Sequence, residues 1–305
     1  MKELRDILAE YARCTSSMGL ATIVSTTGSS YRKTGARMLI LPDGRTVGTL
    51  SGGCIEEEVA QRALHVMETG EPALLSIDTR RRFGCHGSIE IFVEKIEPGD
   101  DFMGYLSDCI SSRRPAHVKV IFEAGHSQRG SYPEDEVHMG IGGHEELILP
   151  PVRLVVCGDS PGNEALMHLA KTLGWDCILL EHPEDSTLAV DERTAIVIKN
   201  HHFGRDFVSL RWALSHSVGY VGLLGSRKRK QELMNALVAE GWEPEDASLN
   251  HFHSPAGLDL GAEEPEQIAL SITAEILAVL SRHHAGFLRD RQGPIHHILC
   301  TSAAL

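Results

Sequence analysis

Short apolar segments alternate with helical patterns through the second half of the chain. Apolar runs of strand length occupy residues 153–157, 177–181, 195–199 and 220–224, and helical spacing follows near 163–173 and 207–216. Strands that alternate with helices form a parallel sheet with helices on both faces. Further helices are expected after Ser226, a suitable N-cap, and from Pro265, a residue suited to a first helical position. The sequence therefore predicts a doubly wound, Rossmann-like domain.

The first half of the chain has a mixed pattern. Strands are expected at 20–25, 73–77 and 89–94, a hairpin at 37–50 around Asp43-Gly44, and a helix at 55–67. Residues 124–151 are polar and rich in Gly, Pro and His, without a sustained period. The predicted fold class is α/β, with an N-terminal α+β domain at 1–123, a linker at 124–151 and the Rossmann-like domain at 152–305.

Composition limits the classes of function. The 305 residues are 42% hydrophobic, enough for two cores, and a net charge of −13 disfavours nucleic acid and anionic lipid as partners. The 7 cysteines are scattered without a Cys-x-x-Cys pair, which is typical of a reducing compartment. With a charged start and no long apolar run, the expected location is the cytoplasm, without membrane association.

The loop Ser51-Gly52-Gly53-Cys54 stands between a predicted strand and a predicted helix. Two glycines there can turn backbone N–H groups toward an anion, and a helix N-terminus lowers the pKa of a cysteine thiol. The charges of Glu56, Glu57 and Glu58 oppose both effects. A tight turn with a small buried cysteine is an equally good interpretation. Arg32, Lys33 and Arg37 are the candidate cationic partners.

A second glycine-flanked cysteine, Cys85, follows three arginines in the segment 80–87. The arginines either face a phosphate or solvate a loop. If Cys54 and Cys85 meet, their thiols suit a soft metal. The remaining Cys14, Cys109, Cys157 and Cys177 are expected to pack in the core.

The Rossmann-like half has an incomplete dinucleotide motif. The turn reads Gly158-Asp159-Ser160-Pro161-Gly162, with Ser160 where the second glycine is needed. The candidate nucleotide-binding residues are Gly158, Ser160, Gly162, Asn163, Glu181, His201, Gly225 and Ser226. A shell that no longer binds NAD(P) is at least as good an interpretation, and for His201 and His202 a solvated loop is the favoured interpretation.

Several segments together resemble one family. They are Gly28-Ser29-Ser30-Tyr31-Arg32-Lys33-Thr34-Gly35-Ala36-Arg37, Gly48-Thr49-Leu50-Ser51-Gly52-Gly53-Cys54-Ile55-Glu56, Gly84-Cys85-His86-Gly87, Tyr220-Val221-Gly222-Leu223-Leu224-Gly225-Ser226-Arg227 and Ser254-Pro255-Ala256-Gly257-Leu258-Asp259-Leu260-Gly261. This set is similar to the XdhC/CoxI family of molybdenum-enzyme accessory proteins. His86 departs from the family's usual Gly-Cys-Gly-Gly, and the turn at Gly158 departs from its usual Gly-Ala-Gly-His.

The resemblance implies a maturation chaperone rather than an enzyme. It would bind the molybdenum cofactor (molybdopterin) and deliver it, after sulfuration, to a xanthine dehydrogenase-type hydroxylase, with a cysteine desulfurase as a further partner and a homodimer as a candidate assembly. The implied cofactor-binding residues are Ser29, Arg32, Gly35, Ser51, Gly52, Gly53, Cys54, Glu56 and Cys85, with Cys54 and Cys85 as molybdenum contacts. The alternative is an NAD(P)-dependent oxidoreductase that uses the Rossmann-like domain.

Overall fold

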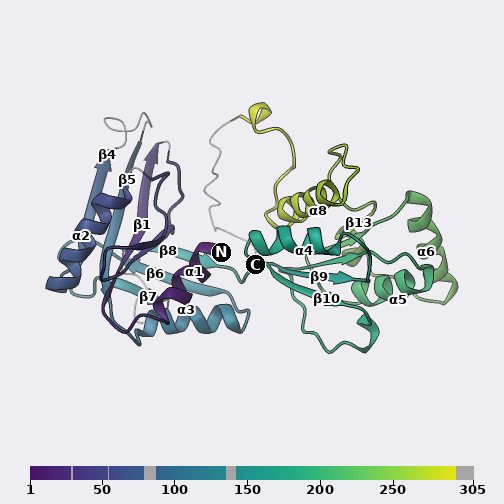
Figure 1. The fold of residues 1–305 in the computed structure, drawn as a ribbon, viewed down its shortest axis with the longest axis horizontal. Coiled ribbons are helices and arrows are strands. Elements are labelled where there is room, and N and C mark those ends of the chain that lie inside the picture. The colour runs from purple at the N-terminus through teal and green to yellow at the C-terminus, as the bar shows by residue number, and fades with distance from the viewer. Residues whose placement is uncertain (29, 54, 79–86, 135–141, 293–305) are drawn as a thin grey trace. The chain divides into compact units, whose positions relative to one another are not determined.

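The computed structural model describes residues 1–28, 30–53, 55–78, 87–134 and 142–292. The chain divides into two compact units, with Met1–Pro150 in the first and Pro151–Arg291 in the second (Figure 1). In the described residues, no helix combines the length and apolar composition needed to cross a membrane.

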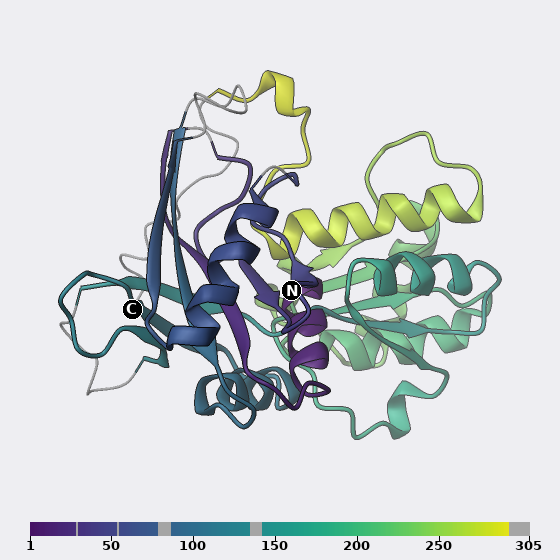
Figure 2. The same ribbon diagram turned by 60° about the vertical axis from the view of Figure 1, so that its left-hand side comes forward.

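The first unit is built on a five-stranded antiparallel sheet. Its spatial order is β3 (Thr46–Gly48), β2 (Arg37–Ile40), β1 (Met18–Gly28), β5 (Gly87–Ile96) and β4 (Ala73–Asp78). Successive side chains on β1 point to opposite faces, so Leu20 enters one core and Ala21 the other. Helix α2 (Glu56–Thr69) covers the Ala21 face, as Figure 2 shows.

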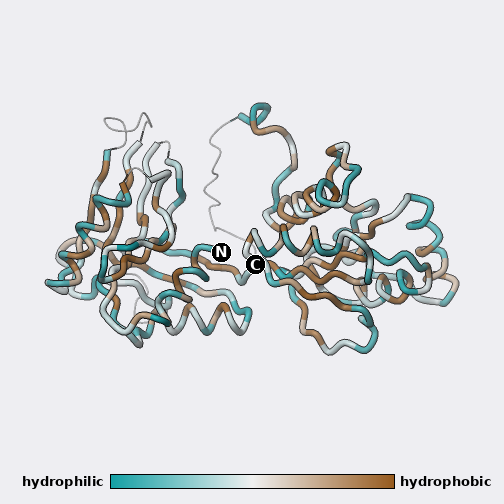
Figure 3. Tube along the Cα trace, viewed as in Figure 1, coloured by the Kyte–Doolittle hydropathy of each residue, from teal (hydrophilic) through white to brown (hydrophobic). Residues whose placement is uncertain are grey.

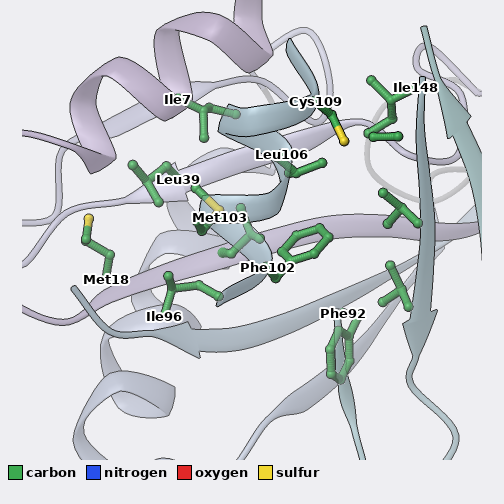
Figure 4. Close-up of a cluster of buried hydrophobic side chains, with 14 of the residues drawn as sticks. Ile7, Met18, Leu39, Phe92, Ile96, Phe102, Met103, Leu106, Cys109 and Ile148 are labelled. Carbon is green, nitrogen blue, oxygen red and sulfur yellow. The ribbon is translucent and has the colours of Figure 1, made fainter. Parts of the chain in front are cut away.

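The second face of this sheet packs against α1 (Lys2–Tyr11), α3 (Asp101–Ser111) and a smaller sheet. Figure 4 shows the resulting core, in which Ile7, Phe92, Phe102 and Ile148 come from four different elements. Helix α3 begins at a side-chain cap, because Asp100 Oδ1 accepts a hydrogen bond of 3.1 Å from Met103 N.

The smaller sheet corrects the prediction of a linker at 124–151. It consists of β7 (Gly130–Pro133), β6 (Ala116–Ile121) and β8 (His144–Ile148), with both outer strands antiparallel to β6. Two of its three strands lie in the predicted linker. The polar composition misled the prediction because β8 alternates exposed and half-buried residues and buries only Ile148.

A carboxyl group, Glu94, is buried where β5 meets β7. Ser131 donates two hydrogen bonds to it, from Oγ to Oε1 at 2.5 Å and from N to Oε2 at 2.9 Å. Burial raises the pKa of Glu94 to about 7, an effect that nearby Asp100 reinforces and that the Ser131 hydrogen bonds and Arg37 oppose. Folding therefore favours the protonated carboxyl.

The second unit contains a five-stranded parallel sheet. The order is β10 (Asp176–Leu180), β9 (Arg153–Cys157), β11 (Thr194–Ile198), β12 (Tyr220–Leu223) and β13 (Phe252–His253). Leu154 and Val156 face α4 (Asn163–Thr172) and α8 (Pro265–Leu280), whereas Val155 and Cys157 face α5 (Phe203–Leu214) and α6 (Arg227–Ala239). Apolar strands thus run between two helical layers (Figure 3), which confirms the doubly wound, Rossmann-like class.

The predicted elements of this unit agree closely with the observed ones. Ser226 caps α6 by accepting from Arg229 N at 3.2 Å, and Pro265 is the first residue of α8. Helix α5 begins at Phe203, several residues before its predicted start. The short elements η1 (Pro183–Asp185), α7 (Asp246–Asn250) and η2 (Leu288–Asp290) were not predicted.

The buried carboxyl predicts a pH-dependent stability. An unfolded Glu94 releases its proton near pH 4.5 and the folded one near 7, so folding binds a proton between these values. Stability should fall as pH rises through that window. We expect Glu94→Gln, which cannot ionise, to be more stable than the wild type at pH 8 by about 3 kcal/mol and to differ little at pH 4. Urea unfolding at both pH values measures this, and an equal difference at both would contradict it.

Candidate functional site

The Ser51-Gly52-Gly53 loop is held by a carboxylate from the helix that follows it. Glu56, the first residue of α2, accepts four hydrogen bonds. Oε1 accepts from Leu50 N at 3.1 Å and Ser51 N at 2.7 Å, and Oε2 accepts from Ser51 Oγ at 2.8 Å and Ile55 N at 3.1 Å. Burial opposes ionisation of Glu56, but the hydrogen bonds from Ser51 and Ile55 outweigh it and hold its pKa below the usual value.

These hydrogen bonds occupy backbone N–H groups that the sequence predicts to face an anion. The N–H groups of Leu50, Ser51 and Ile55 already bond to Glu56, and Gly53 N donates to Ser51 Oγ at 3.2 Å. An incoming anion would have to compete with a carboxylate of the chain itself. Gly53 has φ +103°, a conformation that favours glycine, and no atom of the described residues lies within 4 Å of a built Cβ there.

The loop at 30–37 adjoins the loop at 51–53. Arg32 donates through both Nη atoms to the carboxylate of Glu3 in α1, and Thr49 Oγ1 donates to the same carboxylate at 3.0 Å. A Cβ built on Gly52 would lie 4.0 Å from Tyr31 Cζ, and the Tyr31 side chain is exposed. Glu3 therefore links the segment 28–37, through Arg32, to the segment 48–56, through Thr49.

Arg37 is buried beside this link. Its Nη1 donates to Glu146 Oε2 at 2.7 Å and to the carbonyl of Gly35 at 3.0 Å, while Nε and Nη2 have no hydrogen-bond partner among the described residues. Gly35 has φ +85°, and a Cβ there would lie 2.4 Å from Glu146 Oε1. Arg32, Arg37, Glu3 and Glu146 line a cavity of about 130 Å³. Glycine at position 35 lets Glu146 approach the arginine.

Three predicted cofactor residues, Ser29, Cys54 and Cys85, lie outside the described residues. The structure does bring together Arg32, Gly35, Ser51, Gly52, Gly53 and Glu56 at one end of the first unit. Among the other cysteines, Cys109 and Cys157 are buried, and Cys14 and Cys177 are half-buried. Within the described ranges, no three His, Cys, Asp or Glu side chains are grouped to hold a metal.

The turn after β9 is closed by its own contacts. Gly158 has φ +121°, and a Cβ there would lie 2.5 Å from the carbonyl oxygen of Lys199. Asn163 Nδ2 donates to the carbonyl of Gly158 at 2.8 Å, and Ser160 Oγ lies 2.9 Å from His201 Nε2. The glycine is needed for close packing of the turn against the end of β11.

A cavity of about 560 Å³ lies at the carboxyl edge of the parallel sheet, where strand order reverses. Glu181, which follows β10, lines it together with the exposed His201 and His202. Gly225 and Ser226 do not line it, and the Ser226 hydroxyl caps α6. Part of the predicted nucleotide set is thus gathered at one cavity.

Sequence reasoning missed three residues that shape these sites. Glu3 and Glu146 are distant in sequence from the motif segments that they contact, and no local pattern singles them out. Lys199, whose ammonium donates to the carbonyl of Pro161 at 2.7 Å, was predicted only as the end of a strand. Its signal was a lysine at the end of an otherwise apolar run.

Comparison with known families defines the class of this protein. Residues 15–78 match the description "XdhC and CoxI family", and residues 154–276 match "XdhC Rossmann domain". A Bacillus subtilis protein, named as a probable subunit of xanthine dehydrogenase, is 30% identical over 86% of this chain and 93% of its own length. The chain therefore belongs to the XdhC and CoxI family.

Two further proteins are similar over most of the chain. The Escherichia coli molybdenum cofactor insertion chaperone PaoD is 27% identical, covering 85% of this chain and 82% of that protein. A crystal structure from Bacillus halodurans, described as a xanthine dehydrogenase, has a TM-score of 0.74 and 24% identity, covering 93% of this chain and 97% of that one. This structural likeness supports the fold.

The Glu56 contacts predict how the glycine loop is stabilised. In Glu56→Gln, the amide supplies one acceptor oxygen in place of two, so we expect a loss of about 1–3 kcal/mol in the free energy of unfolding at pH 7. Faster amide exchange at Ser51 and Ile55 should accompany it. Glu57→Gln, an exposed position in the same helical turn, is the matched control. Equal exchange in the two variants would contradict the role of Glu56.

Proposed function

We propose that this chain is an accessory protein that binds the molybdenum cofactor and delivers it, after sulfuration, to a xanthine dehydrogenase-type hydroxylase. The observation that carries the proposal is that the two family segments 28–37 and 48–56 meet at the carboxylate of Glu3. Arg32 from the first motif and Thr49 from the second both donate to Glu3. The name of the Escherichia coli relative, a molybdenum cofactor insertion chaperone, supports a maturation role, and the name of the Bacillus subtilis relative supports an association with xanthine dehydrogenase.

The described residues suit the anionic part of such a cofactor. Arg32 is partly exposed, and the buried Arg37 has two guanidinium nitrogens without hydrogen-bond partners among the described residues, so this end of the unit has cationic donors beyond those its carboxylates use. The cavity of about 130 Å³ has room for one small group, with the rest of the cofactor outside it. Arg32 would orient the phosphate, and thiolates of Cys54 and Cys85 would suit a soft metal, which supplies the chemistry of sulfur exchange when bound.

A carrier role also agrees with the way the cationic groups are paired. Glu3 holds Arg32 and Glu146 holds Arg37, so each arginine is neutralised when no ligand is present. A ligand phosphate would exchange with a carboxylate rather than fill an uncompensated site. Such exchange favours release as well as binding, which delivery to a partner requires.

The hydroxylase is the proposed partner, with a cysteine desulfurase supplying sulfur and a homodimer as the proposed assembly. The role is a non-catalytic one, placed in the cytoplasm. An NAD(P)-dependent oxidoreductase has less support, since Ser160 and Pro161 replace residues that a pyrophosphate would approach.

Cofactor retention tests this function. We expect protein purified from a cofactor-producing host to carry molybdenum and pterin, and Cys54→Ala and Cys85→Ala each to retain less than about a tenth as much, because loss of a metal contact costs at least a factor of ten. Molybdenum is measured by mass spectrometry and pterin by fluorescence after oxidation.

The matched control is Cys14→Ala, which removes a half-buried thiol that lies outside both motifs. It should retain cofactor as the wild type does. Equal retention in all three variants would show that thiols do not hold the cofactor, and absence of molybdenum from the wild type after mixing with released cofactor would overturn the function itself.

A further inference from the structure

A buried ammonium group in the second unit has no counter-ion among the described residues. Lys199 is 9% exposed, and its single hydrogen bond is from Nζ to the carbonyl of Pro161 at 2.7 Å. Burial lowers the pKa of Lys199, and no neighbouring carboxylate raises it. A buried cation without an anionic partner is costly, so the site favours a ligand that supplies negative charge.

Two helices begin beside this ammonium. A Cβ built on Gly162, the N-cap of α4, would lie 2.8 Å from Lys199 Nζ and 3.2 Å from Pro265 Cβ at the start of α8. The first turns of both helices carry partial positive charge. Glu264 caps α8, and Glu164 and Glu266 lie in the first turns of α4 and α8. The Lys199 ammonium and the two helix N-termini thus lie close together.

Donors connect this point with the large cavity at the sheet edge. Ser160 Oγ donates to the carbonyl of Pro161 at 3.2 Å, the same oxygen that Lys199 contacts, and lies 2.9 Å from His201 Nε2. His201 also lines the cavity of about 560 Å³. Ser160 and Lys199 do not line this cavity themselves, so a ligand in it would reach them with a phosphate that extends past His201.

The cavity has the chemistry of a nucleoside site. Glu181 follows β10, the position from which a carboxylate accepts hydrogen bonds from ribose hydroxyls, and it has no ion pair within the described part of the chain. The other two acidic groups are partnered, Asp159 with Arg205 and Glu184 with His182, each at 3.5 Å. The imidazoles of His201 and His202 can lie against a base.

We infer that the second unit binds a mononucleotide, with its phosphate at Lys199 Nζ and Ser160 Oγ and its ribose at Glu181. The site excludes a dinucleotide. Pro265 Cβ lies 3.2 Å from a Cβ built on Gly162, in the turn that a second nucleotide would have to approach, and Pro161 removes one N–H group from that turn. The inference is independent of the proposed cofactor-binding role of the first unit.

Calorimetric titration of the full chain tests the site with AMP, CMP, GMP, UMP, adenosine, NAD and inorganic phosphate. At least one mononucleotide should bind saturably, with NAD, adenosine and phosphate each at least tenfold weaker. Lys199→Met should weaken mononucleotide binding at least tenfold and leave adenosine binding unchanged. Lys171→Met, which removes a lysine from the last turn of α4, should bind as the wild type does.

Each alternative outcome is decisive. Absence of mononucleotide binding at millimolar concentration, or equal binding by wild type and Lys199→Met, would overturn the site. NAD binding as tight as the tightest mononucleotide would overturn the exclusion of a dinucleotide, and phosphate binding as tight as that mononucleotide would overturn the nucleoside part.

A measurement on the wild type covers the case in which Lys199→Met does not fold. The tightest of the four mononucleotides should protect Lys199 from an amine-reactive label at least threefold, as read by peptide mass spectrometry, and leave Lys171 labelled as before. Equal labelling of Lys199 with and without that nucleotide would overturn the assignment.

Discussion

The first unit depends on carboxylates that satisfy donors from distant segments. Glu56 holds the backbone of the glycine loop, Glu3 joins that loop's strand to the loop at 30–37, and Glu146 holds the buried Arg37 from a second sheet. Without these acceptors the N–H and guanidinium donors would be left unpaired, and Arg37 would be a buried charge with no partner. The conformation of the motif loops is therefore set by charge pairing as much as by their glycines.

The second unit depends more on apolar packing than on charge pairing. Its sheet is mainly apolar on both faces, and the strand residues Tyr220 and His253 contact one carboxylate of α8, Glu275. At the carboxyl edge, however, Lys199 is drawn into the turn by a carbonyl oxygen alone, whereas the buried Asp206 is paired with Arg229 at 2.6 Å. Of these two buried charges, Lys199 has no counter-ion among the described residues, and it lies at the edge where ligands bind in open α/β sheets.

Local sequence patterns predicted the elements well and their partners poorly. The alternation at 153–224 and the Asp43-Gly44 hairpin depend on period and turn chemistry, which neighbouring residues determine. Residues 130–148 were misread because strands β7 and β8 are stabilised by pairing with β6 rather than by their own hydrophobicity. Pairing across a sheet is not encoded in either strand alone.

Contacts between side chains and distant or neighbouring backbone groups also explain why the candidate sites were only partly predicted. The glycine loop was recognisable, and so was the objection from Glu56, but only the fold shows that this carboxylate bonds to the loop's own N–H groups. What looked like repulsion of a ligand is an internal acceptor that preorganises the loop. For the proposed carrier, this distinction matters, because an anion would compete with Glu56 for the N–H groups of the loop and with Glu3 for the guanidinium of Arg32.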